Sequence, residues 1–327
     1  MRQALAQARR LVASPVGRVV LALALIVVLG LVFNADGAFL RWTTHRDMLR
    51  QVSVYGILAC GMTIVIITGG IDLSVSSVLA VSAVGFCLLT IQKGWSAPIA
   101  IAVCLAGGAV AGAASGVLVG RLKIQSFVVT LAAMVLLRGL AKYMSGGQKI
   151  STYVQETGQV VSLPAIFERI DARVLADNIP IVTLVFLACV AVTAFVLRRL
   201  RLGRYLYATG GNAEAARLSG VPVPRVLTLA YALSGLFAAI AGVCQAAQEQ
   251  QGDPETGMGY ELQAIAMVVI GGTDLAGGRG GIALTTVGAL TIGYLQKILS
   301  INAVGEASRL MLTGAIIVCA VLLQRRK

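Results

Sequence analysis

The stretch APIAIAVCLAGGAVAGAASGVLV, from Ala97 to Val119, carries no charged residue. It is longer than the roughly 20 helical residues that cross a bilayer core of about 30 Å. Nine further apolar runs are Val19–Phe33, Gln51–Thr68, Leu73–Ile91, Ser126–Met144, Ile181–Leu197, Val226–Gln248, Glu261–Ile270, Ile282–Leu299 and Arg309–Leu323. Because they do not alternate over about ten residues as barrel strands do, we expect helices, which satisfy their own backbone hydrogen bonds in lipid. The sequence predicts an all-α polytopic membrane protein with about ten transmembrane helices.

The composition agrees with this prediction and leaves no room for a separate soluble domain. Of the 327 residues, 57% are hydrophobic and 13% are charged, and the mean hydropathy is +0.86. A soluble domain would carry nearly twice that fraction of charged residues. Ten crossings would use about 200 residues and leave the remainder for loops. We therefore expect a single transmembrane domain over residues 1–327.

The N-terminal segment, residues 1–18, contains four arginines and no acidic residue, and the first apolar run follows it directly. Such a segment could be a signal peptide cleaved near Ala35 to Gly37. Because many further apolar runs follow, we favour an uncleaved first helix with its N-terminus in the cytoplasm.

The net charge of +13 raises the question of nucleic acid, but the arginines lie at the ends of apolar runs. Topology explains this placement better, because cytoplasmic loops are enriched in Lys and Arg. Residues 198–225 hold six basic residues and one acidic residue, whereas residues 145–178 hold three basic and four acidic ones. We therefore expect a cytoplasmic loop at 198–225, an external loop at 145–180, both termini in the cytoplasm, and no nucleic-acid partner.

Residues for catalysis or metal binding are scarce. The single histidine, His45, is expected in an external loop, and no Gly-Lys dipeptide of a Walker phosphate loop occurs. The six cysteines lie singly in apolar runs, which favours neither a disulfide framework nor a metal site: Cys60, Cys87, Cys104, Cys189, Cys244 and Cys319. We expect no cofactor and no catalysis. If ATP drives this protein, another polypeptide hydrolyses it.

The segment GRYLYATGGNAEAARLSGVPVP, residues 203–224, predicts a short helix outside the membrane. Asn212 is a good N-cap, Glu214 lies in the first turn, and Arg217 lies near the end. Gly220, followed by Pro222, supplies a stop. A helix of about two turns is marginal alone in water, so it needs a surface to pack on. That surface is either the ends of the protein's own helices or a groove on a partner.

Four motifs together resemble a known family. They are TGGIDLSVSS at residues 68–77, KIQSFVVTL with RGL within 123–140, GRYLYATGGNAEAARLSGV from residue 203, and TGMGYELQAIAMVVIGGTDLAGGRG at 256–280. In order and spacing they resemble the permease subunits of ribose-type bacterial ABC sugar importers. The resemblance extends from about Val52 to Leu323.

The resemblance implies a permease in the inner membrane that works as a homo- or heterodimer. Its partners would be two cytoplasmic P-loop ATPase subunits and a periplasmic sugar-binding protein, which delivers a monosaccharide, a ribose-like pentose or a hexose. The loop after the sixth span would provide the helix that couples to the ATPase, and it falls on Asn212, Glu214, Ala215, Arg217, Leu218, Ser219 and Gly220. Ser76 stands where the family usually has glycine, and Asp274 stands where serine is usual.

Two similar pentapeptides raise the question of a translocation path. Gly69-Gly70-Ile71-Asp72-Leu73 recurs as Gly271-Gly272-Thr273-Asp274-Leu275, which is a weak hint of an internal repeat. Acids near membrane depth face water, a partner or a substrate path. Gly69 and Gly70 permit a helix break in which Asp72 could bind sugar hydroxyls. The alternative, slightly favoured, is that Asp72 caps the next helix. We include Gly69, Gly70, Asp72 and Asp274 as path candidates, although the role of Asp274 stays unassigned.

The external loop is the natural receiver of a binding protein, and a simple cap over the pathway is an equal alternative. Glu261, Arg138 and Lys142 could serve in docking or could extend to the headgroups. A rival function is an ion-coupled secondary transporter that loads protons or Na⁺ on Asp72 and Asp274. A membrane-embedded enzyme ranks last, because catalytic His/Asp and metal constellations are missing.

Overall fold

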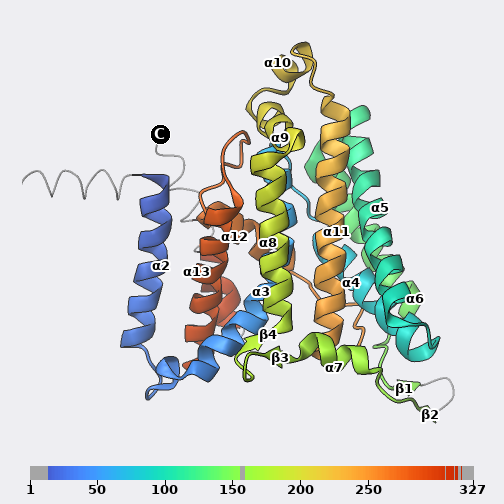
Figure 1. The fold of residues 1–327 in the computed structure, drawn as a ribbon, viewed down its shortest axis with the longest axis vertical. Helices are drawn as coiled ribbons and strands as arrows, with labels where there is room; N and C mark the ends of the chain where they lie inside the picture. Colours follow the sequence, from blue (N-terminus) through green and yellow to red (C-terminus); the bar gives the residue numbers. More distant parts are fainter. Residues whose placement is uncertain (1–13, 155–158, 306, 313, 316–317, 319–327) are drawn as a thin grey trace, which may run out of the picture.

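The computed structural model shows a bundle of helices (Figure 1) and describes residues 14–154, 159–305, 307–312, 314–315 and 318. The long helices are α2 (Pro15–Val32), α3 (Trp42–Ile67), α4 (Val75–Cys87), α5 (Ala97–Arg121), α6 (Ser126–Ser145), α8 (Ile181–Arg199), α11 (Val223–Glu249) and α13 (Ile282–Ile301). Shorter helices are α7 (Ala165–Asp171), α9 (Arg201–Gly211), α10 (Ala213–Leu218) and α12 (Tyr260–Ile270), with a 3₁₀ turn at Ala38–Leu40 and a π-helical turn at Leu88–Gln92. Two antiparallel hairpins pair β1 (Tyr153–Val154) with β2 (Gln159–Val160) and β3 (Arg173–Val174) with β4 (Ile179–Pro180).

The prediction of an all-α polytopic membrane protein is confirmed. Seven of the described helices are long and apolar enough to cross a membrane, and α2 and α12 are shorter apolar helices. The run Arg309–Leu323 lies largely outside the described residues, as does the segment before residue 14. The number ten and the location of the termini therefore stay predictions.

Helix α3 begins at Trp42, well before the apolar run at Gln51 that predicts it. The expectation that His45 lies in a loop is therefore wrong. His45 lies in the first turn of α3, and its ring centroid is 5.4 Å from that of Phe39 and 5.8 Å from that of Tyr294. The apolar pattern does not predict this turn, because charged residues occupy it. Those charged residues form ion pairs with distant parts of the chain.

Helix α11 is at the centre of the bundle and packs against α3, α4 and α5, while α6 packs against α4 on one side and α2 packs against α13 on the other (Figure 1). The five described cysteines are buried and free, as expected of small apolar residues. We call the end that carries α9 and α10 the α10 end, and the opposite end, with α7 and the strands, the hairpin end. Helices α3 and α11 connect the two ends.

Glycines bring α5 and α11 into close contact. Gly108, Gly112, Gly116 and Gly120 recur at every fourth position and lie on the buried face of α5. A Cβ at Gly112 would collide with the backbone carbonyl of Tyr231 on α11. Small residues at this spacing allow membrane helices to approach at backbone distance, where dispersion forces hold them together.

Gly112→Ala is expected to destabilise the protein by about 1–3 kcal/mol, because the added methyl must force α5 away from α11. The matched control is Gly107→Ala in the same helix, where an added Cβ has no neighbour within 4 Å. The melting temperature of the purified protein in detergent should fall for Gly112→Ala and hold or rise slightly for Gly107→Ala. Equal melting temperatures would contradict the packing argument.

Candidate functional site

The predicted short helix is present as α10, Ala213–Leu218, with the predicted cap. The Asn212 side chain accepts a hydrogen bond of 2.9 Å from the Ala215 backbone N–H. Arg217 donates to Glu214 through Nε at 3.0 Å and through Nη2 at 2.5 Å. The chain turns away at Gly220, which has φ +84°. Cap, ion pair and stop therefore follow one another within nine residues, as the segment's sequence indicates.

Helix α10 protrudes from the bundle and exposes most of its side chains (Figure 1). Leu218 is 75% exposed although it is apolar, and Ala216 is the buried residue of the helix. The hydrogen bond from Arg217 lowers the pKa of Glu214 below its ordinary value, and Glu214 in turn raises the pKa of Arg217. Both side chains are thus charged at neutral pH, and the helix presents an ion pair next to an exposed leucine.

Helix α9, which the sequence analysis did not predict, attaches α10 to the bundle. Leu206 and Gly203 are buried against the bundle, while Arg201 and Arg204 point to solvent. The Tyr207 hydroxyl donates a hydrogen bond of 2.9 Å to the Gly280 carbonyl in the loop between α12 and α13. The spacing of Leu202 and Leu206 is a helical signal, but it is short and lies among arginines.

The loop after α3, the loop after α12 and the end of α9 that leads into the third loop meet at the α10 end. We call this contact the three-loop junction and define it by Gly69, Gly210, Gly277 and Gly278. The Gly278 N–H donates a hydrogen bond of 2.9 Å to the Ile67 carbonyl at the end of α3. A Cβ at Gly210 would collide with that same carbonyl, and a Cβ at Gly277 would lie 2.7 Å from the Gly69 nitrogen. The end of α9 is therefore packed backbone to backbone against the ends of the two loops that carry Asp72 and Asp274.

Asp72 lies in the break between α3 and α4 and is only 1% exposed. Its Oδ1 accepts hydrogen bonds from the Ser74 N–H at 3.0 Å and the Ser74 hydroxyl at 2.6 Å. Its Oδ2 accepts one of 2.7 Å from the Ser234 hydroxyl on α11. The carboxylate thus connects the start of α4 to the middle of the bundle, with Gly69 and Gly70 beside it.

Asp274 occupies a similar local turn but has a different environment. Its Oδ1 accepts a hydrogen bond of 3.0 Å from the Ala276 N–H, and its own N–H donates to the Arg279 carbonyl at 3.1 Å. Asp274 is partly exposed, whereas Asp72 is buried. Within the described residues, no cluster of His, Cys, Asp and Glu has the arrangement of a metal site.

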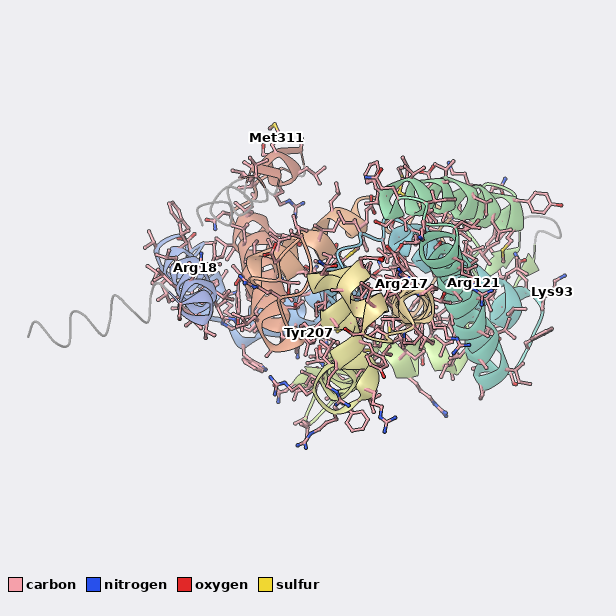
Figure 2. The ribbon with its side chains drawn as sticks, turned by 90° about the horizontal axis from the view of Figure 1, so that it is seen from above. Arg18, Lys93, Arg121, Tyr207, Arg217 and Met311 are labelled. Atoms are coloured by element: carbon pink, nitrogen blue, oxygen red, sulfur yellow. The ribbon has the colours of Figure 1, made fainter. Side chains whose placement is uncertain are left out.

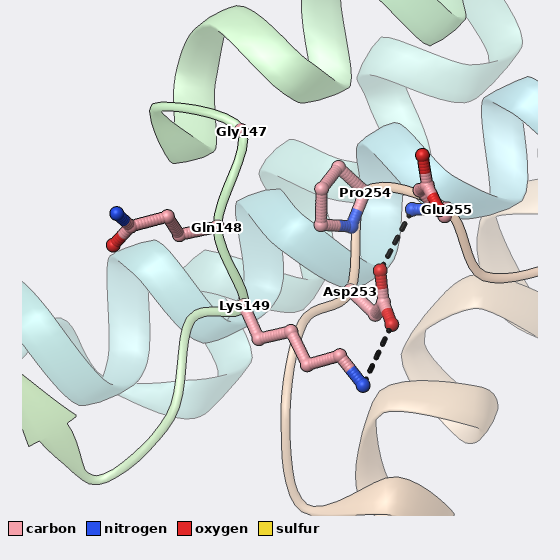
Figure 3. A pocket seen from close by; sticks show the side chains of 6 residues that line it. All are labelled: Gly147, Gln148, Lys149, Asp253, Pro254 and Glu255. Atoms are coloured by element: carbon pink, nitrogen blue, oxygen red, sulfur yellow. Dashed lines mark hydrogen bonds and ion pairs between the residues drawn. The ribbon is translucent and has the colours of Figure 1, made fainter.

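At the hairpin end, a cavity of about 540 Å³ opens between the loop after α6 and the loop between α11 and α12 (Figure 3). Its lining residues are Gly147, Gln148, Lys149, Asp253, Pro254 and Glu255. Lys149 pairs with Asp253 at 3.1 Å, and Lys142 pairs with Glu255 at 2.8 Å. Arg138 donates to the carbonyls of Pro254 and Thr256 at 2.7 and 2.8 Å. Arg138 and Lys142 therefore both hold the α11–α12 loop onto α6.

This arrangement defines a multi-pass membrane transport protein: the bundle has interrupted helices, an exposed capped helix at one end and a cavity lined by charged residues at the other. The chain belongs to the family described as branched-chain amino acid transport system / permease component, whose family model matches residues 46–321.

Characterised relatives cover nearly the whole chain. The ribose import permease protein RbsC of Escherichia coli strain K12 is 39% identical over 308 residues, which is 93% of this chain and 92% of that protein. RbsC of Bacillus subtilis strain 168 is 36% identical over 305 residues, with the same coverage. The xylose transport system permease protein XylH of E. coli K12 is 31% identical over 357 aligned positions, covering 93% and 90%. No solved structure matches the chain.

Gly210→Ala is expected to open the three-loop junction, because its Cβ would occupy the position of the Ile67 carbonyl that accepts from Gly278. Hydrogen exchange in peptides covering residues 68–74 and 271–281 should become roughly tenfold faster, as expected from losing about one hydrogen bond's free energy. Gly211→Ala is the matched control, since a Cβ there has no neighbour within 4 Å. Unchanged exchange in Gly210→Ala would show that the junction does not depend on this close approach.

Proposed function

We propose that this chain is the permease subunit of an ATP-binding-cassette importer that carries a monosaccharide, a ribose-like pentose or a hexose, across the cytoplasmic membrane. It works as a dimer with an identical or related permease. Two P-loop ATPase subunits bind the α10 end, and a periplasmic binding protein delivers the sugar at the hairpin end. The observation that carries the proposal is the capped, exposed helix α10, which α9 attaches to the three-loop junction, in a chain similar to ribose and xylose permeases.

The distribution of charge supports a cytoplasmic α10 end. The start of α2 and the end of α5 lie toward the α10 end (Figure 1), so Arg18, Arg121 and Arg217, which are labelled in Figure 2, all belong to that end. The loop 198–225 adds further arginines. Among the ion pairs of the described residues, Glu214–Arg217 is the one at the α10 end, whereas the others lie at the hairpin end. An excess of unpaired basic residues is typical of the cytoplasmic side. Residues 1–18 and 198–225 are thus assigned to the cytoplasm, and 145–180 to the outside.

In this proposal, α10 is the coupling helix, with Asn212, Glu214, Ala215, Arg217, Leu218, Ser219 and Gly220 in the ATPase groove. The exposed Leu218 provides apolar contact and the ion pair provides orientation. Motion of α10 passes through α9 to Gly210, which touches Ile67 and Gly278. It therefore reaches the loops of Gly69, Gly70, Asp72 and Asp274, which we assign to the inner end of the translocation path. ATP chemistry belongs to the partner subunits.

The cavity at the hairpin end, together with the external loop, suits a binding protein. Its rim carries both signs of charge, with Lys142 and Glu255 49% and 61% exposed. Exposed charges of this kind orient an incoming partner more than they add affinity.

Disrupting α10 should uncouple ATP hydrolysis from uptake. Ala216→Pro removes the N–H that donates to the Asn212 carbonyl at 2.9 Å and should destabilise this short helix by about 3 kcal/mol. Glu214→Ala with Arg217→Ala, or a bulky residue at Gly220, should act in the same direction. In proteoliposomes holding the complete importer, sugar uptake should be lost while the permease remains in the membrane.

Arg204→Ala is the control, since it removes an exposed arginine from α9 without touching α10. Uptake that survives disruption of the whole helix from Asn212 to Gly220 would refute the coupling role. Uptake that collapses with an uncoupler at constant ATP would refute the importer class itself and favour ion coupling through Asp72 and Asp274.

Lys142→Glu should weaken stimulation of the ATPase by the binding protein about fivefold, because exposed charges orient an incoming partner. Unstimulated hydrolysis should be unchanged, because an exposed ion pair contributes at most about 1 kcal/mol to the free energy of unfolding. Adding Glu255→Lys restores the internal pair with reversed signs. If the double variant recovers stimulation fully, Lys142 acts through the loop and does not contact the binding protein.

A further inference from the structure

A group of polar and aromatic side chains lies beneath the α11–α12 loop and takes no part in the contacts described above. The Tyr55 ring from α3 lies 4.4 Å from the Tyr260 ring, centroid to centroid, at an angle of 61°. Gln245 donates a hydrogen bond of 2.6 Å to Glu249 one turn later in α11. The Thr256 hydroxyl approaches both Glu249 oxygens at 3.4 and 3.5 Å. We call Tyr55, Gln245, Glu249, Thr256 and Tyr260 the Tyr–Glu cluster.

The cluster lies where the membrane-crossing path of the chain is interrupted. Helix α12 has 11 residues, so it spans about 16 Å, roughly half of a bilayer core. Its first residue, Tyr260, therefore lies deep in the bundle, and the loop from Gln250 to Gly259 must return inward from the hairpin end to reach it. Irregular backbone at such depth is tolerated where it is buried in protein or lines a polar path.

Gln245 and Thr256 are buried, Tyr55 and Tyr260 are half-buried, and Glu249 at the end of α11 is exposed. Polar and ionisable groups in a membrane bundle generally face a water-filled path or pair with one another. The Tyr–Glu cluster brings together a carboxylate, a carboxamide, an aliphatic hydroxyl and two phenols from α3, α11 and α12. A sugar offers hydroxyl groups, which donate to a carboxylate and accept from an amide, and apolar C–H faces, which pack against aromatic rings. The long contacts between Thr256 and Glu249 are weak, so a sugar hydroxyl could replace them with a shorter bond to the charged oxygen.

The loop over the cluster is tied to α6. Arg138 holds the carbonyls of Pro254 and Thr256, and the Lys142–Glu255 and Lys149–Asp253 pairs hold the outer part of the loop. Beside it, the Glu261 Oε2 is buried without a hydrogen-bond partner among the described residues. The cavity in Figure 3 is thus lined by Asp253, Pro254 and Glu255 of this loop, whereas Thr256 of the same loop belongs to the Tyr–Glu cluster.

We propose that the Tyr–Glu cluster is a sugar-binding site on the translocation path. The sugar enters it from the hairpin end when the α11–α12 loop moves. The inference rests on the proposed importer function and adds to it the residues that contact the sugar. Glu249, Gln245 and the phenol hydroxyls of Tyr55 and Tyr260 hydrogen-bond its hydroxyls, and the two tyrosine rings pack against its C–H face. The cluster differs from the path candidates at Gly69 to Asp72, which lie near the α10 end.

The test compares uptake of D-ribose and D-xylose by proteoliposomes that contain the complete importer with its ATPase and binding protein. Glu249→Gln and Tyr260→Phe keep side-chain size and should lower uptake about tenfold, the effect of losing a hydrogen bond to a charged or buried group. The ratio of ribose to xylose uptake should also change. ATPase stimulation by the loaded binding protein should stay within about twofold of the wild type, because neither Glu249 nor Tyr260 lines the cavity at the hairpin end or belongs to α10.

Tyr143→Phe on α6 is the matched control, since Tyr143 is 86% exposed and should leave both uptake and selectivity unchanged. Tyr55→Phe provides a second variant if Tyr260→Phe is poorly folded. If uptake and ATPase activity fall in parallel with an unchanged sugar ratio, the cluster is structural and the inference is wrong. Unchanged uptake in Glu249→Gln also overturns it. If the wild-type importer takes up neither sugar, the proposed function fails first, and the inference fails with it.

Discussion

A backbone group inside a membrane must find a hydrogen-bond partner within the protein, and this constraint governs how the bundle is interrupted. The break after α3 meets it through neighbours from distant parts of the chain. The Ile71 N–H donates to the Ser126 hydroxyl at 3.4 Å, and the Thr130 hydroxyl donates to the Ile71 carbonyl at 3.2 Å. The Ile67 carbonyl accepts from Gly278. Each interruption is therefore also a point of contact between helices.

These contacts give the two ends of the bundle different physical characters. At the α10 end, glycine backbones are in direct contact. A displacement of α9 therefore moves the neighbouring backbone, because no flexible side chain lies between them to absorb it. At the hairpin end, exposed ion pairs hold the α11–α12 loop, and such pairs are weak and easily exchanged. A rigid junction at one end and a readily released loop at the other suit the function proposed above, in which ATPases bind the first end and a binding protein the second.

Much of the fold could be predicted because a membrane helix is recognisable from its own stretch of sequence. The runs Ala97–Val119 and Ser126–Met144 differ from α5 and α6 by at most two residues at their ends, since an apolar run must match a bilayer whatever it packs against. Helix α10 was equally readable, because the Asn212 cap, the charges and Gly220 act within one short segment. The first turns of α3 could not be predicted, because the charged residues Arg46 and Arg50 are typical of a loop. In the structure they pair with Asp177 and Asp171, which are distant in sequence.

The sequence by itself determined that the chain is an all-α membrane protein, which of its segments form long apolar helices, and where the short exposed helix begins and ends. Run length, capping and charge are local properties. Tertiary structure alone decided that Gly69, Gly210 and Gly277 lie in contact, that Asp72 accepts a hydrogen bond from Ser234, and that the Tyr55 ring packs against Tyr260. Those partners are separated by more than a hundred residues or come from different helices, and only packing of the helices brings their side chains together.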